Sequence, residues 1–127
     1  MITKAINKLN KYIINNNFKG YDPYDALTSP VFDKIKNPMI GAIITQIFKR
    51  NPINLRSLFA IKPQDNPKGL GLMLKAFSLQ YMITKEQIFK EICNNIYLRL
   101  LSLKSPDFPE YCWGYNFPWS NPNEYLP

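Results

Sequence analysis

Apolar residues recur at helical spacing in several stretches of the chain. The first stretch predicts an amphipathic helix within residues 1–17, with Lys and Asn on its polar side. Its apolar positions are Ile2, Ile6, Leu9 and Ile13. A second run begins near Met39 and predicts a helix that ends before Pro52, because proline cannot continue a helix.

Two further helices are predicted as an antiparallel hairpin. Asn66 followed by Pro67 is typical of a helix N-cap with proline in the first turn, and the apolar residues after it keep helical spacing. Thr84 and Gln87 have the spacing of a capping box, which predicts the start of the next helix. Because the connection is short, we expect the two helices to pack side by side in a hairpin region over residues 38–104.

The predicted fold class is all-α, built from antiparallel helical hairpins. We expect one α-helical domain over residues 1–127, itself incomplete, with an irregular and extended aromatic-rich and proline-rich segment over residues 105–127. The predicted helices over residues 40–48 and 70–79 are apolar over more than one stripe, which is typical of helices covered on several sides. A partner chain or self-association is therefore expected to cover their apolar faces.

Aromatic residues alternate with other residues near the C-terminus. If this segment is extended, alternation by two places all its rings on one side of the backbone and makes a stacking surface. The rings belong to Tyr111, Trp113, Tyr115, Phe117 and Trp119. The competing interpretation is that these rings are packing residues, and we favour it because aromatic side chains pack more often than they present a binding face.

Composition excludes several classes of function. The net charge is +7, but the 16 basic residues are scattered, so we interpret them as solvated faces and expect no nucleic-acid partner. With two cysteines and no histidine, neither a metal site nor a cofactor is expected. No apolar stretch is long enough to span a membrane and no secretory signal is recognisable, so we expect a cytoplasmic protein.

Four motifs in order resemble the N-terminal part of a family of bacterial and archaeal proteins. The motifs are Gly20–Leu27, Asn51–Arg56, Asn66–Leu70 and Tyr111–Trp119. The resemblance implies an (α/α) toroid, similar to six-hairpin glycosidases and terpenoid cyclases, in surface polysaccharide biosynthesis. Members of that family continue through further hairpins, so this chain resembles a truncated or split copy of them. No catalytic residues carry over.

Aromatic rings beside carboxylates and an arginine suggest a saccharide-binding surface, because sugar C–H faces stack on rings and sugar hydroxyls need polar partners. The candidate ligand-binding residues are Tyr21, Asp22, Tyr24, Asp25, Arg56, Trp113, Tyr115 and Trp119. In a glycosidase, Asp22 and Asp25 would be the leading acid pair. Two structural alternatives stay open: the carboxylates cap turns, and Arg56 pairs with one of them as an internal clamp.

Two functions from different classes follow. The first is a carbohydrate-binding or carbohydrate-processing toroid fragment, inactive by itself. The second is a non-catalytic helical module for assembly with other helices. A terpenoid-cyclase-like activity is weaker, because the aspartate-rich run typical of those enzymes is absent.

Overall fold

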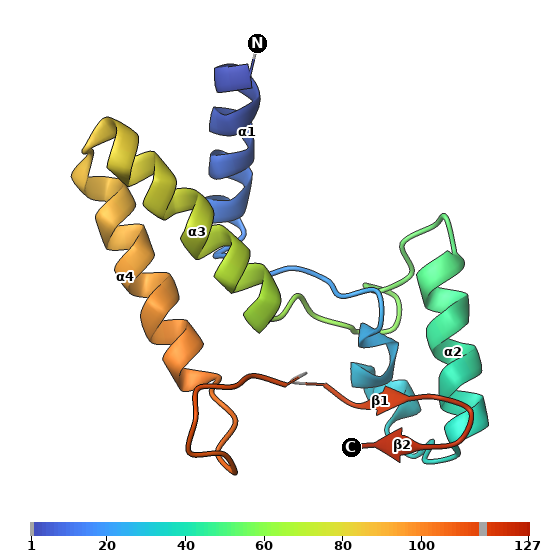
Figure 1. Cartoon of the computed structure of the whole chain (residues 1–127). Coiled ribbons are helices and arrows are strands. Elements are labelled where there is room, and N and C mark those ends of the chain that lie inside the picture. The colour runs from blue at the N-terminus through green and yellow to red at the C-terminus, as the bar shows by residue number, and fades with distance from the viewer. Residues whose placement is uncertain (1, 115–116) are drawn as a thin grey trace. The chain divides into compact units, whose positions relative to one another are not determined.

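The computed structural model describes residues 2–114 and 117–127, and over this part of the chain the fold is predominantly helical (Figure 1). The α-helices are α1 (Ile2–Asn15), α2 (Pro38–Arg50), α3 (Pro67–Thr84) and α4 (Gln87–Ser102). The shorter elements are the 3-10 helices η1 (Asp25–Thr28) and η2 (Pro30–Phe32) and the strands β1 (Trp119–Ser120) and β2 (Tyr125–Leu126). None of the described helices is long and apolar enough to cross a membrane.

The chain forms two compact units, and both are discontinuous in sequence. Unit 1 comprises Met1–Phe18 and Asp65–Gly114, and unit 2 comprises Lys19–Gln64 and Tyr115–Pro127. Helices α1, α3 and α4 belong to unit 1, while α2, the 3-10 helices and the strands belong to unit 2. The predicted hairpin region over residues 38–104 thus contains helices of both units.

The hairpin of α3 and α4 carries the core of unit 1 (Figure 1). As the sequence predicts, α3 starts with Pro67 in its first turn, and the Asn66 side chain accepts a hydrogen bond from the Gly69 N–H at 3.1 Å. The apolar faces of the two helices meet in a buried cluster of Leu70, Phe77, Ile92, Ile96 and Leu100.

The predicted capping box at Thr84 is wrong. Thr84 is the last residue of α3, and its hydroxyl donates to the Gln80 carbonyl at 3.0 Å, one turn back in the same helix. Lys85 follows with a left-handed backbone at φ 61°, which ends α3, and α4 begins only at Gln87 after Glu86 as N-cap. Gln87 is therefore in the first turn rather than at the third helical position that a capping box requires.

Helix α1 reaches the hairpin through its C-terminal end. It ends at Asn15, and Phe18 then packs edge-on against Phe77 with ring centroids 6.3 Å apart. The Arg99 guanidinium donates to the Asn17 carbonyl at 2.8 Å, and the Asn10 amide donates to Gln80 at 2.6 Å. A helix is thus present where the sequence predicts one, and side chains of α3 and α4 contact its last turns and the residues that follow.

Unit 2 is organised around a small aromatic core. The rings of Phe32, Phe48 and Phe59 contact one another with centroids 5.1 to 5.9 Å apart. The buried Ser29 hydroxyl donates to the Phe59 carbonyl at 2.6 Å, so the loop before η2 is tied to the turn that carries Phe59. That turn lies after the end of α2 and before the start of α3.

The end of the chain forms a β-hairpin against α2. In the antiparallel pair, Trp119 lies opposite Leu126, and the Asn121 side chain accepts from the backbone N–H groups of the turn at 2.8 and 2.9 Å. The buried Ser120 hydroxyl donates to the Pro38 carbonyl at 2.7 Å. Within the segment predicted as extended and irregular, the asparagine-stabilised turn thus folds the last residues back into a short hairpin.

Candidate functional site

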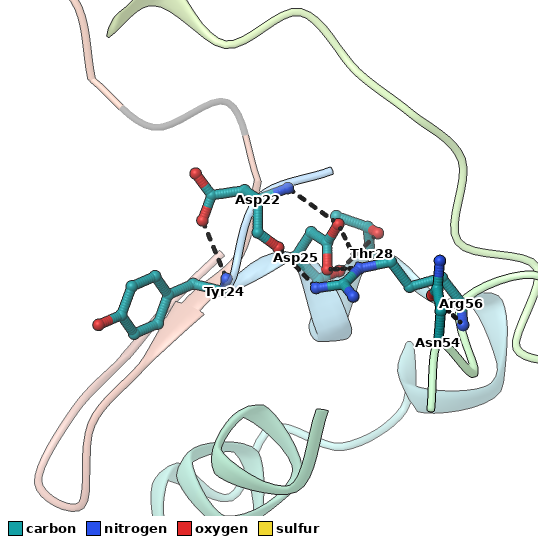
Figure 2. A network of polar contacts seen from close by, with 6 residues as sticks. All are labelled: Asp22, Tyr24, Asp25, Thr28, Asn54 and Arg56. Carbon is teal, nitrogen blue, oxygen red and sulfur yellow. Dashed lines mark hydrogen bonds and ion pairs between the residues drawn. The ribbon is translucent and has the colours of Figure 1, made fainter. Parts of the chain in front are cut away.

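Five of the predicted ligand-binding residues come together in unit 2. A loop before η1 supplies Tyr21, Asp22 and Tyr24, the first residue of η1 is Asp25, and the turn after α2 supplies Arg56. Figure 2 shows the arginine side chain pointing into the loop that carries both carboxylates. The proximity of Asp22, Asp25 and Arg56, expected from the sequence, is therefore present.

The centre of this cluster is a buried ion pair between Asp25 and Arg56. The Arg56 Nε donates to both carboxylate oxygens of Asp25, at 2.9 and 3.1 Å, and its Nη2 donates to the Asp22 carbonyl at 3.0 Å (Figure 2). The side chains of Arg56 and Asp25 are only 15% and 6% exposed. The alternative that Arg56 is an internal clamp is thus confirmed for Asp25.

Backbone groups complete the coordination of both carboxylates. The Asp22 N–H donates to Asp25 Oδ2 at 3.1 Å, and the Asp22 Oδ1 accepts from the Tyr24 N–H at 2.9 Å. The guanidinium carbon of Arg56 also lies 5.3 Å from the centre of the Tyr21 ring. The turn-capping interpretation of the two aspartates is therefore correct for the contacts seen here.

Burial raises the pKa of the Asp25 carboxyl above its ordinary value, and the attraction and hydrogen bonds of Arg56 oppose that rise. A raised pKa is a property that a general acid needs. However, both oxygens of Asp25 already accept hydrogen bonds, and the residue is only 4% exposed. The arrangement holds the loop together, and Asp25 offers no open oxygen to a ligand.

The alternating aromatics do not form one exposed surface over the described residues. Tyr111 is 69% exposed, whereas Phe117 is buried in unit 2. Trp113 belongs to unit 1, where its indole N–H donates to the Leu100 carbonyl at 2.6 Å. Tyr115 lies outside the described residues.

The remaining candidate, Trp119, lines a groove of about 630 Å³ in unit 2, and Tyr24 also lines it. Its apolar lining comes largely from α2 and from the β1–β2 turn, and its polar lining comes from an arginine, two amide side chains and hydroxyl side chains. The apolar members are Met39, Ala42, Ile43, Ile47 and Pro122, and the polar ones include Gln46, Arg50 and Asn121. These groove residues were not among the candidates predicted from the sequence, although the second apolar stripe on α2 indicated that face.

Within residues 2–114 and 117–127, no three or more acidic, cysteine or histidine side chains gather in a way that could hold a metal ion. The comparisons give no relative from which a role could be transferred: no protein-family model, no curated protein and no solved structure matches the sequence.

Proposed function

We propose that this chain is a non-catalytic helical assembly module that binds other helices through apolar faces. The observation that carries the proposal is the exposure of large apolar side chains on helices whose opposite sides are already buried. On α3, for example, Leu70 and Phe77 are in the core, whereas Leu72 and Met82 are 63% and 64% exposed. Large apolar side chains exposed in this way are typical of interaction sites when they adjoin one another.

The same pattern recurs on the other core helices. Large apolar side chains are exposed on α2 in unit 2 and on α4 in unit 1. They are Met39, Ile40, Ile43 and Ile47 on α2, and Ile88, Tyr97 and Leu98 on α4. Helix α2 thus has an apolar face toward its own unit and a second apolar face available to a partner, whereas the exposed apolar residues of α4 are spread around its axis.

The candidate acid pair supports a non-catalytic role. A catalytic carboxylate must reach a substrate, whereas Asp25 is buried and bonded to Arg56. In our proposal the α3–α4 hairpin is one unit of a larger ring of hairpins, the (α/α) toroid in polysaccharide biosynthesis that the family resemblance implies.

Dye binding and sedimentation of the purified chain test the proposal. We expect strong fluorescence of the apolar dye ANS and concentration-dependent self-association, because exposed apolar faces bind the dye and one another. Ile43→Lys and Leu98→Lys should each lower both signals without lowering the midpoint of thermal unfolding. A monomer at all concentrations with weak ANS fluorescence would contradict the proposal.

A saccharide-binding role is the second candidate, and one observation favours it. Tyr24 and Trp119 line the same groove as the amides of Gln46 and Asn121, so rings and hydrogen-bonding groups lie together there. Titration with an oligosaccharide panel should then change the fluorescence of the native chain, and Trp119→Phe should remove most of the change. No response across the panel would reject this candidate.

A further inference from the structure

The groove beside α2 has two walls and a defined size. One wall is the exposed stripe of Met39, Ile43 and Ile47 on α2, which are 61%, 53% and 55% exposed. The other wall includes Trp119 and Pro122 from the C-terminal hairpin. Its volume of about 630 Å³ exceeds that of a crevice between neighbouring side chains and lies in the range of binding sites.

The spacing of the apolar wall suits a helix. Met39, Ile43 and Ile47 follow one another at intervals of four residues, so they form a ridge along one side of α2. From the rise per residue, this ridge is about 12 Å long, which matches roughly two turns of a second helix. Amphipathic helices bind such apolar grooves through residues at the same spacing.

The charge of the groove favours a partner with acidic residues. Arg50 lines the groove at the C-terminal end of α2, and the lining contains no aspartate or glutamate. Over the described residues, the Arg50 guanidinium has no hydrogen bond or ion pair, whereas the neighbouring Lys49 donates to the Tyr24 hydroxyl. A partner with carboxylates near Arg50 would meet complementary charge.

Resting on the proposed function, we propose that this groove binds an amphipathic helix of a partner protein that runs antiparallel to α2 and carries carboxylates in its first turn. Acidic residues are favoured at helix N-termini, where they offset the positive end of the helix dipole. With the N-terminus of the partner beside Arg50, its apolar residues lie along the stripe toward Met39.

A second copy of this chain is a poorer occupant. None of α1, α2, α3 and α4 has an acidic residue in its first turn, and the chain carries a net charge of +7. Glu86 lies just before the first turn of α4, at its N-cap, so a second copy could in principle present this carboxylate to Arg50. If a second copy occupied the groove through that end of α4, Glu86→Lys would weaken self-association as much as Arg50→Glu does.

Labelled helical peptides test the proposal with the full-length chain. The acidic probe has leucines at intervals of four residues and three glutamates in its first turn, and the basic probe replaces those glutamates by lysines. By fluorescence polarisation, we expect the acidic peptide to bind about tenfold more tightly than the basic one at low salt, and the preference to shrink as salt is added. Arg50→Glu should reverse the preference.

Matched variants locate the binding surface. Ile43→Asp in the groove should abolish binding of the acidic peptide, whereas Leu98→Asp on α4 in unit 1 should leave it unchanged. Equal loss with both variants would overturn the groove assignment. Binding of neither peptide, with ANS binding and self-association intact, would overturn this inference while leaving the proposed function standing.

Discussion

Unit 1 and unit 2 bury different kinds of side chain. Among the described residues, the buried side chains of the α3–α4 hairpin are all apolar, whereas unit 2 buries four polar residues. The polar residues are Asp25, Ser29, Thr45 and Ser120. Unit 1 is therefore held mainly by contacts between helix faces, which are non-directional, and unit 2 relies in addition on directional hydrogen bonds.

Three of these four residues, Asp25, Ser29 and Ser120, join segments that are far apart in the sequence, whereas Thr45 bonds to Gly41 one turn back in α2. Ser29 bonds to the Phe59 carbonyl, and Ser120 bonds to the Pro38 carbonyl. Because a buried polar group without its partner costs free energy, each such bond also penalises a misplaced loop. We therefore expect substitutions that remove a buried polar group to destabilise unit 2 even where they leave the buried apolar area unchanged.

The largest expected effect is at the buried ion pair. Arg56→Met should lower the free energy of unfolding of unit 2 by about 3 to 5 kcal/mol, because it leaves the Asp25 carboxylate buried without its cation. Hydrogen exchange resolved along the sequence measures this loss, and residues 19–64 should lose protection while the α3–α4 hairpin keeps it. Equal loss in both units would remove the distinction between them.

A double-mutant cycle provides the control. Asp25→Asn combined with Arg56→Met should recover a large part of the loss, because no unpaired charge remains buried. If the effects of the two substitutions on the free energy of unfolding simply add, Asp25 and Arg56 are not energetically coupled and the ion pair does not act as a clamp.

Sequence periodicity predicted most of unit 1. The start of α3 at Asn66 and the interleaved apolar faces of α3 and α4 follow from local patterns, since a helix repeats within a few residues. The error at Thr84 concerned a helix end, where its hydroxyl bonded back to Gln80 instead of capping the next helix. Local hydrogen bonding of threonine permits both outcomes.

Unit 2 was predicted less well because long-range contacts determine it. The sequence placed Asp25 and Arg56 among the candidates, and their pairing was one of two open alternatives. Nothing local indicated that Ser120 would bond to Pro38, or that Trp119 would fold back beside α2. Periodicity describes one element at a time, so it could not identify the second wall of the groove.

The next largest expected effect is the difference in stability between alanine substitutions at two helix glycines. A Cβ at Gly41 in α2 would lie 2.9 Å from the Ser120 side chain, whereas one at Gly71 in α3 would meet no atom within 4 Å. Gly41→Ala should therefore destabilise unit 2 by about 1 to 3 kcal/mol through overpacking. Gly71→Ala should stabilise α3 by up to about 1 kcal/mol, because alanine favours helix.

Urea denaturation of both glycine variants measures this difference in sign. The contrast depends on the close approach of β1 to α2, so it also checks the fold of the C-terminal hairpin. A stabilising effect of Gly41→Ala would mean that Ser120 does not pack there.

A smaller loss is expected at the start of α3. Asn66→Ala removes the side-chain oxygen that accepts from the Gly69 N–H and should cost about 1 kcal/mol. Thermal unfolding followed by far-ultraviolet circular dichroism measures it, and Asn66→Asp, which keeps the acceptor, serves as the control. An unchanged midpoint for the alanine variant would show that the cap contributes nothing to unit 1.

The smallest expected effect is the pH dependence of the stability of unit 2. Burial raises the Asp25 pKa above its ordinary value of 3.8, and the attraction of Arg56 partly offsets this rise. Between that value and the higher folded-state pKa, the native state holds the Asp25 proton and the unfolded state does not. Linkage then makes the contribution of Asp25 to stability fall as pH rises through this window.

Arg56→Met removes the opposing interaction, so its loss of stability should be greatest near neutral pH and shrink as acid protonates Asp25. Urea denaturation across the acidic range tests this, with Asp25→Asn/Arg56→Met as the reference that lacks the titrating group. A loss in Arg56→Met that is the same at every pH would place the cause in packing rather than in the unpaired carboxylate.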